Sequence, residues 1–137
     1  MEVMTPVERT LTQIDHVRLT RLITRAGPLP GVEAMQQVLE CSDLVASPDV
    51  PPTVLTMYTQ ALLEDPAGGE PYKLTLCYPA DAEPAGGFVS VLSPVGAALL
   101  GLRVGQVARW STPGGGSGAA RILSVLFQPE ASGDYTT

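Results

Sequence analysis

The spacing of apolar residues changes along the chain, and over the first third it is the spacing of a helix. Within residues 12–26, one broad apolar face is formed by Ile14, Val17, Leu22 and Ile23. Thr12 and Asp15 have the spacing of a capping box, which places the start of this helix at Thr12. Gly27 and Pro28 follow the last apolar position, and such a pair commonly ends a helix. The pattern predicts a first helix of about 14 residues.

A second helical pattern runs from Pro30 or Gly31 to Ala46. Its apolar side is formed by Val32, Met35, Val38, Leu39 and Val45. Proline is acceptable at the first position of a helix, where its missing N–H would have no partner. Because the link over residues 27–30 is short, the two helices are expected to be antiparallel neighbours.

A proline-rich joint at residues 47–52 separates this helical part from a region that alternates like strands. The predicted strands cover residues 54–63, 71–78, 88–92, 106–111 and 119–127. A short helix follows the third strand, with Ser93 as N-cap, Pro94 at its first position and Gly101 just past its end. The fold is therefore predicted to be α+β. A short antiparallel helical hairpin covers residues 1–47, and a small β-sheet domain with one short helix covers residues 48–137.

Composition and charge narrow the class of protein. The chain has 137 residues, of which 45% are hydrophobic, so a packed core is expected. Its formal net charge of -6 disfavours direct binding to nucleic acid, which needs a basic surface. No apolar run approaches the roughly 18 residues that span a membrane, and residues 1–10 lack the apolar stretch of a signal peptide. These features predict a soluble, cytoplasmic protein.

Residue types that carry catalysis or bind metals are scarce. His16 is the only histidine, so neither a His-rich metal site nor a Ser-His-acid triad is expected, and we interpret it as an exposed helix residue. Cys41 and Cys77 are far apart in the sequence and have no metal or disulfide spacing, so both are expected to be buried thiols. No catalytic residue, metal or cofactor is predicted.

Two further patterns imitate binding sites. The glycine cluster at residues 114–118 lacks the Lys and Ser/Thr of a phosphate-binding loop, so a hairpin loop is the better interpretation. Pairs of acidic residues lie in predicted turns or near the end of the second helix: Glu64 with Asp65, Asp81 with Glu83, and Glu40 with Asp43. The turn pairs are interpreted as solvated charges, and the helical pair is expected to share one face.

Three segments resemble a known family. Residues 90–106 read SVLSPVGAALLGLRVGQ, residues 128–135 read QPEASGDY, and residues 50–57 read VPPTVLTM. With them the chain resembles the regulator of nucleoside diphosphate kinase family, which is related to the bacterial Gre transcript-cleavage factors. The resemblance covers most of residues 12–135 and is strongest from Ser90 to Gly105.

The resemblance implies a fold and a partner. The family has an N-terminal antiparallel coiled coil, shorter than that of Gre factors, and a C-terminal domain of FKBP-like fold. The implied partner is bacterial RNA polymerase: in Gre-type factors the C-terminal domain docks on the rim of the secondary channel, and the coiled coil points into it. Carried over to this chain, the docking turn is Leu92, Ser93, Pro94 and Val95. The alternative is that Ser93 and Pro94 only cap the short helix, and both roles can hold together.

Two departures from the Gre pattern stand out. Cleavage factors carry acidic residues at the coiled-coil tip that help to bind a second catalytic Mg²⁺, but the tip residues here are Pro28, Leu29, Pro30 and Glu33. Because two-metal chemistry needs such carboxylates, no transcript cleavage is expected. The second departure is Tyr58-Thr59, where the family usually has Asn-Ser.

The resemblance favours a non-enzymatic transcription regulator that binds RNA polymerase, modulates elongation or competes with Gre factors, and affects nucleoside diphosphate kinase indirectly. Two alternatives remain open. One is a prolyl isomerase or peptide-binding module, by analogy with the FKBP-like fold. The other is transcript cleavage despite the missing acids. The oligomeric state and the orientation of the hairpin on the β domain stay open as well.

Overall fold

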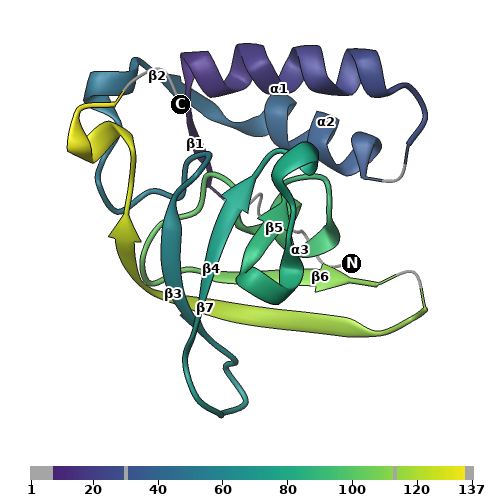
Figure 1. The fold of residues 1–137 in the computed structure, drawn as a ribbon, viewed down its shortest axis with the longest axis vertical. Helices are drawn as coiled ribbons and strands as arrows, with labels where there is room; N and C mark the ends of the chain where they lie inside the picture. Colours follow the sequence, from purple (N-terminus) through teal and green to yellow (C-terminus); the bar gives the residue numbers. More distant parts are fainter. Residues whose placement is uncertain (1–7, 30, 113, 135–137) are drawn as a thin grey trace, which may run out of the picture.

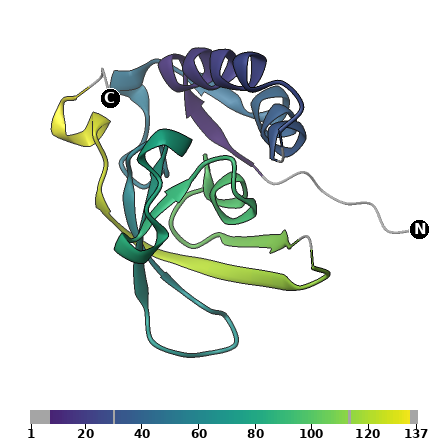
Figure 2. The ribbon, with the colours of Figure 1, turned by 45° about the vertical axis from the view of Figure 1, so that its right-hand side comes forward.

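A computed structural model describes residues 8–29, 31–112 and 114–134 of the chain (Figure 1). The helices and strands run in the order β1 (Thr10–Thr12), α1 (Gln13–Ala26), α2 (Val32–Cys41), β2 (Asp43–Val45), β3 (Gln60–Glu64), β4 (Tyr72–Cys77), β5 (Phe88–Ser90), α3 (Pro94–Leu99), β6 (Val107–Ser111) and β7 (Ser117–Phe127). The α+β class is confirmed. Helices α1 and α2 lie side by side over one end of the sheet (Figures 1 and 2).

The first helix begins and ends where the sequence predicts. Thr12 is its N-cap, and its Oγ1 accepts a hydrogen bond of 3.0 Å from the backbone N–H of Asp15. Gly27 ends the helix with φ of 67°, a conformation that L side chains rarely adopt. The Thr12 hydroxyl thus supplies a partner for a backbone N–H at the start of α1, and glycine at position 27 permits the backbone conformation at its end.

The second helix ends five residues earlier than predicted, at Cys41 rather than Ala46. The Ser42 Oγ donates to the carbonyl of Val38, and from Ser42 the backbone is extended. Residues 43–45 form β2, which pairs in parallel with β1. Because Asp43 lies in this strand, it does not share a helix face with Glu40 as expected.

Five strands form the main sheet, in the order β5-β4-β3-β7-β6, and all neighbours are antiparallel except β4 and β5. The first predicted strand, 54–63, is wrong over its first half, since only Gln60–Glu64 pairs as β3. Tyr58 has φ of 63°, which interrupts an extended strand. Residues 54–59 instead cross over to the segment that follows α3, where the N–H of Leu55 donates to the carbonyl of Leu102 (2.8 Å).

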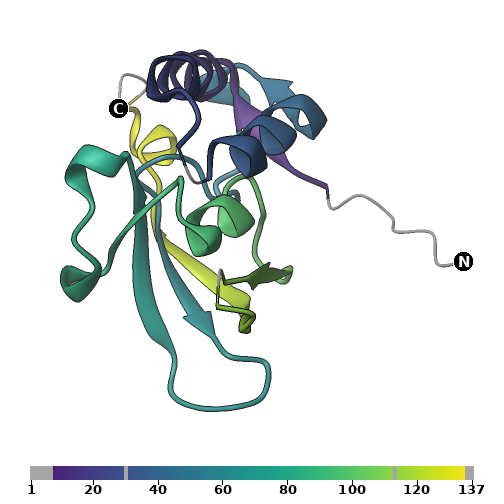
Figure 3. The ribbon, with the colours of Figure 1, turned by 90° about the vertical axis from the view of Figure 1, so that its right-hand side faces the viewer.

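The short helix α3 lies inside the curl of the sheet, between the strands and α2 (Figure 3). The residues predicted to begin and end this helix are confirmed. Ser93 is the N-cap, Pro94 is the first helical residue, and Gly101 has φ of 82° just past the end. Ala97, Ala98, Leu99 and Leu100 are buried, so the helix is a central part of the core.

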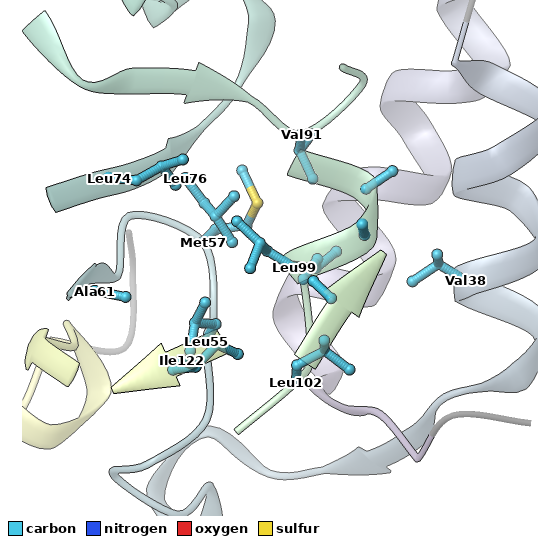
Figure 4. Close-up of a cluster of buried hydrophobic side chains, with 14 of the residues drawn as sticks. Val38, Leu55, Met57, Ala61, Leu74, Leu76, Val91, Leu99, Leu102 and Ile122 are labelled. Atoms are coloured by element: carbon cyan, nitrogen blue, oxygen red, sulfur yellow. The ribbon is translucent and has the colours of Figure 1, made fainter. Parts of the chain in front are cut away.

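One hydrophobic core connects the hairpin and the sheet. It contains Leu19 of α1. It also contains Val38 of α2, Leu55, Met57 and Leu99, which are labelled in Figure 4. Within the described residues, none of the helices combines the length and the apolar character needed to cross a membrane.

The two cysteines differ in their surroundings. Cys77 is buried on β4, as predicted, but Cys41 is exposed at the end of α2. The expectation of two buried thiols is therefore wrong for Cys41. Its helix ends there, and the side chain lines an open groove instead of entering the core.

Candidate functional site

The turn between β5 and α3 is held by the hydroxyls of Ser90 and Ser93. The Ser93 Oγ accepts from the N–H of Gly96 (3.1 Å) and donates to the carbonyl of Ser90 (2.6 Å). The N–H of Leu92 donates to the Ser90 Oγ (3.1 Å). A Cβ at Gly96 would lie 2.1 Å from the Ser90 carbonyl oxygen, so only glycine fits there. Ser93 thus caps α3, and the turn has a fixed shape.

Part of this turn is accessible to a partner. Pro94 is exposed, whereas Leu92, Ser93 and Val95 are half-buried. Leu92 and Val95 also pack against the hydrophobic core, which ties the turn to the body of the domain. The four residues that the resemblance assigns to docking therefore form one rigid, half-exposed element.

The hairpin tip is apolar on its surface. Pro28 and Leu29 are exposed, and 55% of Leu29 is accessible to solvent. Glu33 is exposed in the first turn of α2 and is the only carboxylate among the described tip residues. Pro30 lies outside the described residues.

The structure brings the hairpin tip and the turn together, which the sequence did not indicate. Gly31 has φ of 89°, and a Cβ there would lie 1.9 Å from the carbonyl oxygen of Leu92. The backbone of the α2 N-terminus therefore rests directly on the backbone of the turn. A side chain at position 31 would separate them.

A groove of about 730 Å³ opens beside the turn, between α2, α3 and β6. Apolar residues of the two helices form its walls, and Trp110 of β6 lines it. Arg9 borders the groove, and its Nη1 donates to the carbonyls of Ala97 (3.0 Å), Ala98 (3.3 Å) and Leu100 (2.7 Å). These are carbonyls at the end of α3, which have few partners within the helix itself.

A buried carboxylate joins α1 to the segment before β3. Asp15 is 1% exposed, and its Oδ2 accepts from the N–H of Met57 (3.2 Å). Its Oδ1 is buried without a hydrogen-bond partner among the described residues. Burial is the main cause that raises the pKa of Asp15 from 3.8 to about 6, and the nearby charge of Glu130 adds to it. Glu130 itself accepts from the Thr56 hydroxyl (2.7 Å).

Tyr58 is the one described residue other than glycine with positive φ. Its N–H donates to the carbonyl of Leu76 (2.8 Å), and its hydroxyl donates to a carboxylate oxygen of Asp81. Burial, followed by this hydrogen bond, raises the pKa of Tyr58 to about 12. The departure Tyr58-Thr59 thus falls on a left-handed position, for which asparagine is better suited than tyrosine.

The other chemical candidates have structural roles. His16 is half-buried rather than exposed, with its Nε2 3.2 Å from the carbonyl of Leu39. Gly114, Gly115 and Gly116 belong to the loop that joins β6 to β7, as predicted, whereas Gly118 already lies in β7 and pairs with Trp110. Among residues 8–29, 31–112 and 114–134, no three His, Cys, Asp or Glu side chains come together to hold a metal ion.

Sequence reasoning found the turn but missed the groove, Arg9 and the burial of Asp15. The turn carries a local signal, a Ser-Pro pair before a short helix. The groove takes residues from α2, α3 and β6 together with Arg9, which precedes β1, so no window of the sequence contains it. The burial of Asp15 depends on Met57, which is 42 positions away.

Known families and relatives match either the β domain alone or most of the chain. The sequence model of the family described as "Transcription elongation factor, GreA/GreB, C-term" matches residues 50–127, which include the turn. A protein of Escherichia coli strain K12 named regulator of nucleoside diphosphate kinase is 38% identical over 128 residues, covering 91% of this chain and 93% of the relative. The GreA transcription elongation factor of Solidesulfovibrio magneticus is 42% identical over 73 residues, covering 53% of this chain and 44% of the relative.

A solved structure has the same fold. It is the prokaryotic transcription elongation factor GreA/GreB from Nitrosomonas europaea, with a TM-score of 0.74 and 34% identity, covering 89% of this chain and all of that one. Because this likeness covers 89% of the chain, it extends into the helical hairpin, whereas the family model matches the β domain alone. The chain therefore belongs to the regulator of nucleoside diphosphate kinase family, whose C-terminal domain is of the GreA/GreB type.

Proposed function

We propose that this chain is a non-enzymatic regulator of bacterial transcription that binds RNA polymerase at or near its secondary channel. It would modulate elongation or compete with Gre factors there, and act in the cytoplasm, where the polymerase works. An effect on nucleoside diphosphate kinase would follow indirectly from transcription. The proposal includes the division into a coiled-coil hairpin, residues 1–47, and a domain of FKBP-like type, residues 48–137.

The observation that carries the proposal is the turn Leu92–Val95. It lies inside the region that matches the GreA/GreB C-terminal family, and its shape is fixed by Ser90, Ser93 and Gly96. A preformed, half-exposed turn loses little conformational freedom when it binds, which favours docking. Pro94 offers the most exposed side chain of the four.

The hairpin tip supports regulation without transcript cleavage. Two-metal cleavage needs a carboxylate cluster to hold the second Mg²⁺. The described part of the tip offers Glu33 alone, beside the exposed apolar side chain of Leu29. Because the backbone of Gly31 rests on that of Leu92, the start of α2 also lies close to the docking turn.

The proposal is tested by pulling down RNA polymerase core enzyme with the purified chain. We expect retention by the wild-type chain and loss of most of it when Ser93→Ala and Pro94→Ala are combined. A matched control is Pro84→Ala, because Pro84 is also an exposed proline at the start of a short helical turn, Pro84–Gly86. Equal retention by the double variant and the control would remove the docking assignment.

A second assay tests the absence of catalysis. Stalled elongation complexes incubated with the chain should keep the length of their RNA, whereas a GreA control should shorten it. Shortening by this chain would contradict the proposal and favour cleavage chemistry.

A further inference from the structure

The segment before β3, residues 51–59, is held by side chains from the C-terminal part of the chain. Gln128 is buried, and its Nε2 donates to two backbone carbonyls of this segment, at 2.9 and 2.8 Å. Two residues later, a carboxylate oxygen of Glu130 accepts from the Thr56 hydroxyl (2.7 Å). Glu130 begins the helical turn Glu130–Ser132. This C-terminal turn is therefore fixed to the segment through a buried carboxylate.

The hairpin holds the same segment through a second buried carboxylate. The Oδ2 of Asp15 in α1 accepts from the N–H of Met57 (3.2 Å), the residue that follows Thr56. Two carboxylates from nearly opposite ends of the chain thus bind consecutive residues. Asp15 is 1% exposed and Glu130 is 8% exposed, so water and salt screen their charges poorly. The charge of Glu130 acts on Asp15 and disfavours its ionised form.

Three charged or titratable groups act on Asp15, namely Arg18 of its own helix, Glu130 of the C-terminal turn and Tyr78, which follows β4. Arg18 favours the ionised form of Asp15, but burial and Glu130 oppose it. Burial, followed by the charge of Asp15, raises the pKa of Tyr78 from 10.0, so this phenol stays neutral near pH 7. The Oδ1 of Asp15 is buried without a hydrogen-bond partner among the described residues. An ionised Asp15 therefore buries a charged oxygen that has no donor, which is costly.

We propose that Asp15 and Glu130 form a proton-controlled latch that holds the hairpin and the C-terminal turn on residues 51–59. With the proton on Asp15, the contact buries one negative charge and the latch is closed. When Asp15 gives this proton to solvent, two buried carboxylates repel each other across consecutive residues. Local opening, in which α1 and the C-terminal turn leave the segment together, then becomes more frequent. The inference is independent of the proposed function, because it concerns how firmly the hairpin is held whatever the chain binds.

The pH range of the latch follows from the surroundings of Asp15. Burial is the main cause that raises its pKa from 3.8 to about 6 in the closed state. In the open state the carboxyl is hydrated and ionises near 3.8. Closure is therefore most favoured below about pH 4, and the latch weakens as the pH rises to 6 and through it.

The first test follows the carboxyl carbon of Asp15 by NMR while the pH of the full chain is raised. Glu130→Gln removes the charge and keeps an oxygen that can accept from Thr56, so the pKa of Asp15 should fall by about 0.5 or more. Arg18→Gln removes the opposite charge and should raise the pKa. The matched control is Glu70→Gln, an exposed carboxylate in the turn between β3 and β4, which should leave it unchanged.

The second test measures the opening itself by amide hydrogen exchange, with protection factors corrected for the intrinsic rate at each pH. The N–H groups of Met57 and Ser132 report the two sides of the latch, since they donate to Asp15 and to the carbonyl of Gln128. Between pH 5 and pH 7.5 both protection factors should fall about tenfold in the wild type. Neither should fall in Asp15→Asn, whose amide does not titrate.

An amide of the main sheet separates local opening from unfolding of the whole chain. The N–H of Ile122 in β7 donates to the carbonyl of Gln106 (3.0 Å) and is exposed only when the sheet opens. At each pH, Met57 and Ser132 should be at least about tenfold less protected than Ile122. Equal protection at all three amides would show that the chain opens only as a whole and would overturn the latch.

The remaining outcomes also decide the proposal. An Asp15 pKa that Glu130→Gln lowers no more than Glu70→Gln does would overturn the pairing of the two carboxylates. Because an ionised carboxylate accepts a stronger hydrogen bond, protection at Met57 that rises with pH would overturn the opening. Loss at Met57 without loss at Ser132 would overturn the joint release. Joint losses that are absent in Asp15→Asn support the latch, and none of these results depends on binding to RNA polymerase.

Discussion

Asp15 is a carboxylic acid in the protein interior, at the contact between α1 and the segment before β3. Its backbone N–H donates to the Thr12 hydroxyl, and its side chain accepts from the N–H of Met57. A buried carboxylate is costly when ionised, and the raised pKa of about 6 expresses that cost. The residue therefore links the hairpin to the β domain in a manner that depends on pH.

The pKa of Asp15 predicts how stability changes with pH. Because the folded state holds the proton up to about pH 6 while the unfolded state releases it near 3.8, the contribution of Asp15 is fully present below about pH 4. It is lost as the pH rises through 6, and a shift of this size corresponds to about 3 kcal/mol. Asp15→Asn should lack this loss, because its amide stays neutral and its oxygen can still accept from Met57.

Urea denaturation of both proteins from pH 4 to pH 7.5 checks this. The free energy of unfolding of the wild type relative to Asp15→Asn should fall across that range. A constant difference between the two curves would mean that Asp15 does not titrate in the folded state as its surroundings require.

Gly31 allows a second prediction at the same scale. In Gly31→Ala the new Cβ would meet the Leu92 carbonyl at 1.9 Å and take a positive φ, so we expect a loss of roughly 3 kcal/mol. Gly27→Ala is the control, since Gly27 also has positive φ but nothing lies within 4 Å of its Cβ position. Its expected loss is roughly 1 to 2 kcal/mol, from backbone strain alone. Equal losses by thermal denaturation would show that the tip does not rest on the turn.

At the scale of elements, the N-terminal strand and the short helix α3 are joined more tightly than their distance in sequence suggests. The N–H of Thr10 donates to the carbonyl of Gly101 (2.9 Å), and the Arg9 guanidinium binds three carbonyls of α3. Strand β2 then pairs with β1 and carries the chain from the hairpin back to the domain. These contacts between the N-terminal strand and α3 shape one side of the groove.

Removing the Arg9 side chain should therefore weaken the contact between the N-terminal strand and α3. Arg9→Ala leaves the carbonyls of three buried residues at the end of α3 without this donor, and we expect the free energy of unfolding to fall by roughly 2 kcal/mol. Arg25→Ala, an exposed arginine in the last turn of α1, should cost less than about 1 kcal/mol. Urea denaturation at pH 7 measures both, and losses of equal size would contradict the role assigned to Arg9.

Local signals explain which elements could be predicted. Helix α3 was predictable because Ser93, Pro94 and Gly101 each have a preference that acts within a few residues. Strands β1 and β2 were not, since each has three residues and gains its hydrogen bonds from a partner 33 positions away. The same limit applies to the first half of the predicted strand 54–63, where tertiary contacts hold Tyr58 in a conformation its residue type disfavours.

On the scale of the whole molecule, the hairpin and the β domain share one core, and the hairpin tip lies against the turn proposed for docking. The same element thus builds a wall of the groove and positions the turn. The likeness to the GreA/GreB structure from Nitrosomonas europaea covers 89% of the chain, so this arrangement is shared beyond the β domain. A Gre-type fold whose hairpin tip has few carboxylates favours binding to the polymerase without cleavage of its RNA.

The central claim is that this chain occupies the Gre site on RNA polymerase without cleaving RNA. The most direct measurement is a competition experiment in which fluorescently labelled GreA is bound to RNA polymerase core enzyme and titrated with the unlabelled chain. The account predicts saturable displacement by the wild type, and a shift to at least about tenfold higher concentration when Ser93→Ala and Pro94→Ala are combined. Failure of the wild-type chain to displace GreA at any concentration would contradict it.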